Sequence, residues 1–415
     1  MRRLKSFLVF AFTLVFLLSL TGVAKAESKE ELQMEIETLK KKLKELDERL
    51  EKTEKAQTKQ ETALTDKEKE TYNDMEKIVK LLKGWKLGGL WYISYQNGEK
   101  NDKSYNQFVL KRGYINIEKE ILPWLSFRVT PDINATTADS KTSNLDGSVV
   151  LRLKYAYAKF NIPDFAFFTK PFVEVGEVHV PWLDFEENLN FYRCQDTMFI
   201  ERNDIFNSAD FGITFTTLLG GTMPEDYQNK VNNNYAGKYG SMSFGIYNGT
   251  GYHASEKNRN KVFEGRLTVR PLPEYVPGLQ LSYFGLVGKG NKDTNPDWNV
   301  NLGMISYEHE YFVVTGQYYA GKGRQDGNDE YNKKGYSFFT EIKPHKKFSI
   351  IGRYDYFDPN KDTKDDENRR YIVGVAYHLD KPHKNMVVLD YDKVDYKQKG
   401  KPDDDRVQLT LQLSF

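Results

Sequence analysis

The last nine residues of the chain, 407–415, read VQLTLQLSF. Apolar residues alternate with glutamine, threonine and serine, and the final residue is an aromatic. Because successive side chains of a β-strand point to opposite faces, this pattern predicts a strand with one apolar and one polar face. Such a strand needs a hydrogen-bonding partner for its edge and an apolar environment for one face.

The first 26 residues, MRRLKSFLVFAFTLVFLLSLTGVAKA, have the organisation of a secretion signal. Basic residues open the segment, residues 7–20 are apolar but too short for a comfortable membrane span, and Ala24-Lys25-Ala26 forms a small-residue cleavage pattern. We expect an export signal peptide over residues 1–26; the alternative is an uncleaved anchor helix. Because Cys194 is the single cysteine, no intrachain disulfide bond is expected.

Residues 27–83 contain neither glycine nor proline and are rich in lysine and glutamate. Apolar residues recur in a 4-3 rhythm, which returns in a shifted register between Tyr72 and Leu82. A single charged helix cannot bury such a stripe, so we expect a self-associating coiled coil of up to about 80 Å. The alternative is an isolated or only partly folded helix. The predicted seam consists of Leu32, Ile36, Leu39, Leu43, Leu46 and Leu50.

From Trp85 onward the apolar period changes from 3.5 to 2, and about sixteen strand-like runs follow. No apolar run after residue 26 approaches the roughly 20 residues of a spanning helix. The mean hydropathy is −0.66, yet the chain has 27 tyrosines and 26 phenylalanines. A polar lumen, an apolar outer face and aromatic girdles are typical of outer-membrane barrels. We predict an all-β transmembrane barrel of about 16 antiparallel strands over residues 84–415, after the α-helical coiled-coil segment.

The links between the predicted strands mostly alternate between short and long. Short links carry turn residues, as in ILPWL and KPHKK, and long links such as QNGEKNDKSYN and DPNKDTKDDENRR are polar. This alternation is expected of a barrel with short periplasmic turns and long outer loops, and an even strand number places segment 27–83 in the periplasm. The stretch 222–240 stands where a short turn is expected, but it is long. The predicted strand count could therefore differ by one hairpin there.

A barrel in lipid has to close, because every backbone N–H and C=O group needs a partner there. The terminal strand is therefore expected to pair with the first strand, its apolar residues facing outward and its amide and hydroxyl residues facing inward. Residues Phe415, Leu413 and Leu411 also resemble the assembly signal of bacterial outer-membrane proteins, which implies the barrel assembly machinery as a partner. The alternating pattern by itself also fits the last strand of a soluble sandwich or barrel.

Residues 108–133, FVLKRGYINIEKEILPWLSFRVTPDI, combine a basic strand, a short turn with Trp-Leu-Ser and an arginine on the return. Residues 173–215 contain Phe199-Ile200-Glu201-Arg202, an aromatic-Ile-Glu-Arg element before the next strand. Both stretches resemble phosphate-selective porins of the porin O and P type, and the rest of the barrel region resembles them loosely. The resemblance implies a sixteen-stranded trimeric channel in the bacterial outer membrane with loop three, about 183–209, folded into the pore.

Basic residues occupy predicted inward positions, whereas their neighbours, Val109 among them, are expected to face lipid. The basic residues are Arg112, Arg128, Arg152 and Lys154 on strands two to four, and Arg266, Arg270, Arg353 and Arg370 further along. A stripe of cations would lower the energy of a crossing anion, and guanidinium groups suit phosphate oxygens. The alternative is that these residues pair with Glu118, Asp132, Glu174 and loop acids and brace the lumen.

Loop three is mainly acidic, which argues against a simple anion channel. It carries Asp184, Glu186, Glu187, Asp196, Glu201 and Asp204, but only Arg193 and Arg202 as basic residues. A basic wall facing an acidic loop produces a transverse field that orients polar solutes without strongly selecting one ion. We therefore predict passive diffusion of small hydrophilic solutes and ions, with an anion- or phosphate-selective channel as the alternative. Cys194 is interpreted as an incidental small side chain.

Other classes of function have less support. The chain has six scattered histidines, His179, His253, His309, His345, His378 and His383. No G-x-S-x-G or H-E-x-x-H motif occurs, so neither an enzyme nor a metal or cofactor site is expected. The 60 basic and 59 acidic residues give no bias toward nucleic acid. The helical segment is expected either to hold a homotrimer together or to tether the outer membrane to the cell wall, with peptidoglycan as one partner.

Overall fold

The computed structural model describes residues 66–135 and 149–415, and the chain divides into two units, Met1–Lys83 and Gly84–Phe415. In the first unit the described helix is α3 (Asp66–Leu82), which covers the last part of the helix predicted over residues 27–83. The rest of that prediction lies outside the described residues. The predicted signal peptide and the seam residues from Leu32 to Leu50 lie outside the described residues.

Four apolar side chains of α3 are exposed. Tyr72, Met75, Val79 and Leu82 recur every three or four residues, as expected of one face of a helix. Self-association through this face stays a prediction. None of the helices in the described residues is long and apolar enough to cross a membrane.

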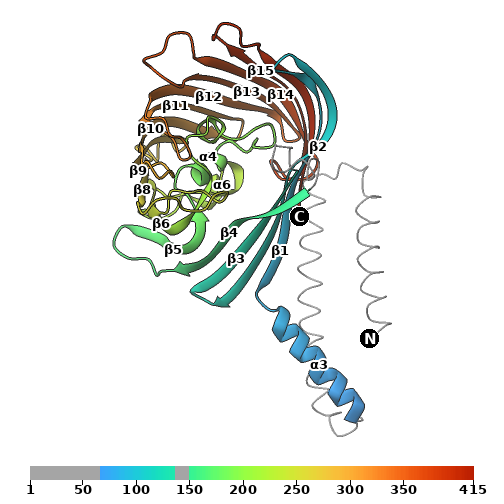
Figure 1. Cartoon of the computed structure of the whole chain (residues 1–415). Coiled ribbons are helices and arrows are strands. Elements are labelled where there is room, and N and C mark those ends of the chain that lie inside the picture. Colours follow the sequence, from blue (N-terminus) through green and yellow to red (C-terminus); the bar gives the residue numbers. More distant parts are fainter. Residues whose placement is uncertain (1–65, 136–148) are drawn as a thin grey trace. The chain divides into compact units, whose positions relative to one another are not determined.

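The second unit is a closed barrel of sixteen antiparallel strands, which follow one another around the barrel in chain order (Figure 1). The predicted strand number and fold class are confirmed. The strands are β1 (Trp85–Lys100), β2 (Lys103–Leu122), β3 (Leu125–Ala135), β4 (Val149–Asn161), β5 (Phe168–His179), β6 (Ala209–Leu219), β7 (Gly240–Tyr247), β8 (Val262–Val269), β9 (Leu279–Lys289), β10 (Asp297–His309), β11 (Phe312–Lys322), β12 (Asn332–His345), β13 (Phe348–Asp358), β14 (Asn368–His378), β15 (Met386–Tyr396) and β16 (Asp404–Ser414). Between strands lie the short helices α4 (Leu183–Glu187), α5 (Phe199–Arg202) and α6 (Glu225–Lys230).

The terminal strand closes the barrel against β1. Gly89 and Phe415 exchange backbone hydrogen bonds of 2.9 and 3.1 Å, so the last residue is inside the ladder. Gln408 and Thr410 are fully buried on the inner face, where the Thr410 hydroxyl lies 2.9 Å from that of Ser94. The predicted pairing of the first and last strands and the predicted inward face are confirmed.

The first link of the barrel is shorter than predicted. Strands β1 and β2 stay paired as far as Lys100 and Lys103, so only Asn101 and Asp102 form the turn. Both residues adopt left-handed φ angles, 51° and 59°, as a two-residue hairpin turn requires. The prediction of a long loop from QNGEKNDKSYN is wrong, because polar residues continue the ladder beyond the apolar zone.

The link between β6 and β7, residues 220–239, contains no additional hairpin of strands. It holds α6 and an isolated bridge between Thr222 and Gly237. Its base is bonded to the neighbouring turns, through Gly220 N–H to Phe167 and through Arg270 N–H to Tyr239. The strand count of sixteen therefore stands, and the long link lies at the same end of the barrel as the short turns.

A β-bulge in β2 changes which side chains face inward. Val109 pairs with the buried Ser94, whereas Phe108 is 82% exposed, so Val109 lies on the inner face. The register shifts just beyond this pair, and both Lys111 and Arg112 point inward. The expectation that Val109 faces lipid is wrong, because strict alternation cannot anticipate a bulge.

Candidate functional site

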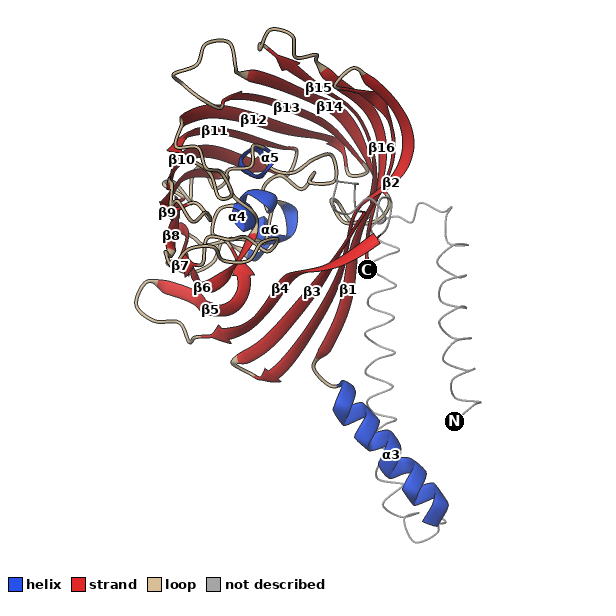
Figure 2. Ribbon diagram, in the orientation of Figure 1, coloured by secondary structure: helices blue, strands red, loops and turns tan. Residues whose placement is uncertain are grey.

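The link between β5 and β6, residues 180–208, is called L3 and folds into the barrel. Figure 2 shows its helices α4 and α5 inside the ring of strands. The Trp182 and Phe206 rings lie 5.8 and 5.4 Å from the Phe284 ring on β9. The L3 side chains of this cluster are Val180, Trp182, Leu183, Phe185, Leu189, Met198, Phe199, Ile200, Ile205 and Phe206. Each large side chain that leaves water there contributes about 1.5–3 kcal/mol, so L3 is firmly held.

The inner face of β8–β11 supplies the other half of this cluster. Its members are Val262, Phe284, Leu286, Trp298, Val300, Leu302, Met304 and Tyr319, and all are buried. L3 therefore covers an apolar stretch of the inner wall that would otherwise face water.

The middle of L3 reaches the wall formed by β1, β2 and β16. Lys111 donates to the carbonyl oxygens of Cys194 (2.7 Å) and Gln195 (2.5 Å), and the Gln408 amide donates to the Gln195 carbonyl at 2.8 Å. Burial raises the pKa of the Cys194 thiol to about 12, which leaves it protonated and unreactive. This agrees with the interpretation of Cys194 as a small structural side chain.

Residues 220–239 support L3 from the other end of the barrel. The Asn232 side-chain amide donates to the Asn188 carbonyl of L3 and to Glu308 of β10, both at 2.7 Å. The Tyr235 hydroxyl donates to Asp184. Asp184, one of the predicted constriction acids, is thereby used to fasten L3.

A cavity of about 560 Å³ lies where L3 faces β2 and the β7–β8 and β11–β12 links. Three arginines and four carboxylates are among its lining residues. The arginines are Arg112, Arg202 and Arg324, and the carboxylates belong to Asp196, Glu201, Asp204 and Asp326. His253 also lines it. The cavity brings Arg112 together with four of the predicted loop residues.

The predicted basic stripe on β2–β4 lies on the inner face, but its charges are largely compensated. Arg112 and Arg152 both bind the fully buried Asp132, at 2.9 and 2.5 Å. Arg128 binds Asn116 at 2.9 Å and approaches Glu118 at 3.9 Å. Lys154 lies over the rings of Tyr114 and Tyr155, 4.6 and 5.1 Å from their centres.

The remaining predicted wall cations are buried against L3 and its support. Arg266 donates to the Pro181 carbonyl at 3.0 Å, and Arg353 donates to the Thr197 carbonyl at 3.0 Å. Arg270 donates to the Tyr227 hydroxyl of α6 at 3.1 Å. Arg370 binds Asp196 together with Asp392. Three of these arginines therefore fix L3, Arg270 fixes the link that supports it, and none of the four lines the cavity.

The predicted loop acids separate into two groups. Glu186 accepts hydrogen bonds from Trp182 (2.8 Å) and Gln317 (2.5 Å), and burial raises its pKa. Glu187 binds Arg193 at 2.7 Å. Glu186 lies away from the cavity, whereas Asp196, Glu201 and Asp204 line it.

The charged residues at the cavity are paired as well. Arg193 binds Glu201, and Arg202 binds Asp355. Burial opposes ionisation of Glu201, but the Arg193 guanidinium lowers the pKa of Glu201 overall, so it is ionised at neutral pH. Burial raises the pKa of Asp204.

His253 lies beside Arg152, with 3.4 Å between its Nδ1 and the guanidinium. Partial desolvation and then the charges of Arg152 and Arg112 lower the pKa of His253 to about 4. At neutral pH the imidazole is therefore uncharged, and the cavity carries nearly balanced fixed charge.

Several cavity or loop-holding residues were not predicted: Lys111, His253, Arg324, Asp326 and Arg406. The adjacent basic residues Lys111 and Arg112 were a usable signal, because two neighbouring cations cannot both face inward without a bulge. No comparable signal exists for Arg324, because a strand pattern does not tell where a link folds.

No family model matches the chain, and no curated protein is similar to it in sequence. Solved structures match its barrel. An anion-selective porin from Comamonas acidovorans matches with a TM-score of 0.53 and 12% identity, covering 80% of this chain and 99% of that one. OmpF of Salmonella typhi, solved with daunomycin, matches with a TM-score of 0.53 and 11% identity, covering 80% of this chain and 97% of that one. OprB of Pseudomonas putida matches with a TM-score of 0.53 and 10% identity, covering 82% of this chain and 96% of that one.

The fold thus defines the class: this chain contains the sixteen-stranded barrel of the outer-membrane porins. At 10–12% identity these likenesses show the fold alone. The phosphate-selective O and P type stays a prediction.

Proposed function

We propose that this protein is an outer-membrane diffusion channel, without enzymatic activity, through which small hydrophilic solutes and ions pass passively. The water-filled lumen is narrowed by L3, and selectivity between ions is weak. The observation that carries the proposal is the cavity beside L3, whose lining includes both arginines and carboxylates. Charges of both signs around a narrow passage orient polar solutes without retaining one kind of ion.

The pairing of the wall arginines favours weak selectivity over a phosphate-selective channel. A phosphate-binding stripe requires guanidinium groups whose donors are free for the ligand. Arg112 and Arg152 instead share Asp132, and Arg370 is shared by Asp196 and Asp392. The porin from Comamonas acidovorans is described as anion-selective, but the compensated charges of this chain support only a small preference.

We propose the following arrangement in the cell. Residues 1–26 direct export, the barrel 84–415 lies in the outer membrane, and residues 27–83 extend into the periplasm. Phe415 and the preceding alternating residues are recognised by the barrel assembly machinery. The exposed apolar face of α3 supports self-association, with a homotrimer as the expected state and a tether to peptidoglycan as the second role.

Planar-bilayer recording in a salt gradient tests the proposal. The expected result is a large ohmic single-channel conductance with a reversal potential close to zero. A closed barrel without conductance would overturn the channel itself. A reversal potential near the equilibrium potential of the anion would overturn weak selectivity and favour the phosphate-selective alternative.

A further inference from the structure

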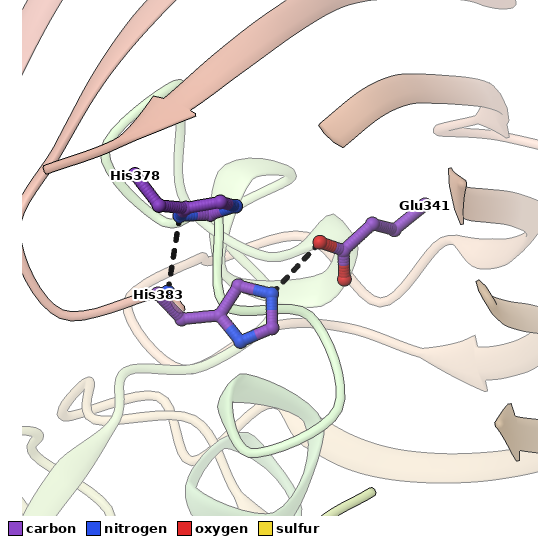
Figure 3. A group of neighbouring side chains, drawn as sticks. All are labelled: Glu341, His378 and His383. Atoms are coloured by element: carbon purple, nitrogen blue, oxygen red, sulfur yellow. Dashed lines mark hydrogen bonds and ion pairs between the residues drawn. The ribbon is translucent and has the colours of Figure 1, made fainter. Parts of the chain in front are cut away.

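Two histidines that are separate in the predicted strand pattern meet a glutamate inside the barrel. Glu341 lies on β12, His378 ends β14, and His383 lies in the turn that follows, residues 379–385. Figure 3 shows the three side chains converging, and their candidate ligand atoms all lie within 4.8 Å of one another. Glu341 is fully buried and His378 is 1% exposed. The interpretation of the histidines as scattered does not hold for this pair.

The two oxygens of Glu341 are used very unequally. Oε1 accepts hydrogen bonds from the Tyr192 hydroxyl (2.6 Å), the Ser349 hydroxyl (2.7 Å) and His383 Nε2 (2.8 Å). Oε2 is buried and has no hydrogen-bond partner among the residues that the structure describes. Leaving a buried acceptor unsatisfied costs about 1–3 kcal/mol. A cation bound at this carboxylate would remove that cost.

We propose that Glu341, His378 and His383 bind a divalent transition metal ion of the zinc type. Two imidazoles with one carboxylate suit zinc and its first-row neighbours, whereas calcium and magnesium prefer oxygen ligands. Three protein ligands leave a fourth position for water or a solute group. This inference does not depend on the proposed diffusion function.

The present spacing requires only a small closure. Two ligands of one tetrahedral zinc ion, each about 2.1 Å from it, are about 3.4 Å apart. The three ligand atoms are spread over up to 4.8 Å, so the side chains have to approach by up to about 1.4 Å. His383 can supply this movement because it lies in a turn and not in a strand.

Side chains of L3 surround the site. The Phe191 ring stacks on His383 at 4.3 Å and 8°, and Tyr192 bonds to Glu341 while its ring meets His383 edge-on at 5.7 Å. The Ser349 hydroxyl connects two of the proposed ligands: it donates to Glu341 and lies 3.0 Å from His378 Nε2. Such neighbours orient the ligands of a metal ion and adjust its affinity. A bound ion would therefore link β12, β14 and the turn that carries His383, against which L3 packs.

Binding has a defined proton balance. An ion at His383 Nε2 requires the neutral tautomer with its proton on Nδ1, so the hydrogen bond from Nε2 to Glu341 is exchanged for bonds to the metal. His378 has to give up either its Nε2 contact with Ser349 or the hydrogen bond that its Nδ1 accepts from the His383 backbone N–H at 3.2 Å.

The test uses the full chain, folded in detergent, stripped with a chelator and titrated with Zn²⁺ alone. Bound metal is counted by elemental analysis and affinity is measured by calorimetry. We expect one zinc ion per chain, and a loss of affinity of about 100-fold in His383→Gln and in His378→Gln. His345→Gln, on the same strand as Glu341, is the matched control and is expected to bind as the wild type does.

Glu341→Gln separates coordination from folding, because the amide keeps an acceptor for Tyr192 but is a poorer metal ligand. Heat-dependent migration in electrophoresis shows that each variant is folded. If folded wild-type protein fails to bind zinc, or if the three variants bind it as tightly as His345→Gln does, the cluster is only a hydrogen-bonded brace and the proposal is overturned.

Discussion

The two sides of the barrel's inner surface are built from different residues. Along β8–β11 a block of inward apolar side chains lies beneath L3, as Phe284 and Trp298 do, next to inward polar residues such as Gln317. Along β2–β4 most inward side chains are charged, amide or hydroxylic, and Asp132 joins Arg112 to Arg152. Both sides belong to one closed sheet. Closure of the sheet therefore determines the barrel wall, and the polarity of the inner face decides where water and solutes can pass.

Strand β10 illustrates the difference most clearly. Its inward residues Val300 and Leu302 are 1% exposed, whereas Asn301 and Gly303 face outward and are exposed. The usual pattern of a transmembrane strand is reversed there, because the inner face packs on a loop instead of water. An apolar inner face in a barrel sequence thus predicts a lumen covered by a loop.

The largest expected effect comes from detaching L3 from the apolar side. Trp182→Ala removes a fully buried indole and its hydrogen bond to Glu186, at a cost of about 3–5 kcal/mol. We expect a higher and noisier single-channel conductance, measured in planar bilayers. Trp124→Ala is the control, because Trp124 is 51% exposed. Equal conductance in the Trp182 variant and the wild type would mean that L3 does not narrow the passage.

A smaller effect is expected from charge reversal on the polar side. Arg112→Glu changes the lining of the cavity by two charges, so cations should be favoured. The cation-to-anion permeability ratio should rise about threefold to tenfold, equivalent to about 0.7–1.4 kcal/mol. The reversal potential in a salt gradient measures it. Lys238→Glu makes the same charge change in an exposed pair with Glu274 and should have no effect.

The support from residues 220–239 is expected to matter for stability more than for selectivity. Asn232→Ala removes two buried hydrogen bonds, to Asn188 and Glu308, and should cost about 1–3 kcal/mol. Thermal unfolding in detergent should show a lower midpoint with an unchanged reversal potential. Asn260→Ala, which removes an exposed contact with Asn295, serves as the control. Equal midpoints for the two variants would argue that this link does not hold L3.

The smallest expected effect is one of pH at the cavity. The pKa of His253 is lowered to about 4, so the ring is uncharged at pH 7 and gains a positive charge only near pH 4. Below that pH the wild type should become more permeable to anions than His253→Gln, and at pH 7 the two should agree. Reversal potentials from pH 7 to 3.5 check this; a difference between the two proteins already at pH 6 would contradict the lowered pKa.

Much of the barrel could be predicted from sequence because lipid imposes a simple rule. The alternation that ends at Phe415 indicated closure against the first strand, and the strand number followed from counting similar runs. The tight turn at Asn101 could not be predicted, since it depends on how two strands pair and not on either strand alone. The bulge at Lys111 left one signal in the sequence, the two adjacent cations Lys111 and Arg112.

The candidate site was less predictable than the barrel. The inward position of Arg112 follows from chemistry along one strand, whereas its partner Asp132 and the nearby Arg324 come from other strands and links. The meeting of His378 and His383 with Glu341 likewise depends on strand register over β12–β14. Sequence patterns predict the face on which a residue lies, but not the residue that it meets across the lumen.

The central claim is that solutes pass along β2–β4 and not along β8–β11, and cysteine modification tests it most directly. The native Cys194 is fully buried, so single cysteines can be introduced at Glu118 on the polar side and at Met304 beneath L3. A charged thiol reagent is added during single-channel recording. The account predicts that conductance through Glu118→Cys falls while Met304→Cys stays unaffected; block of the Met304 variant with none of the Glu118 variant would contradict it.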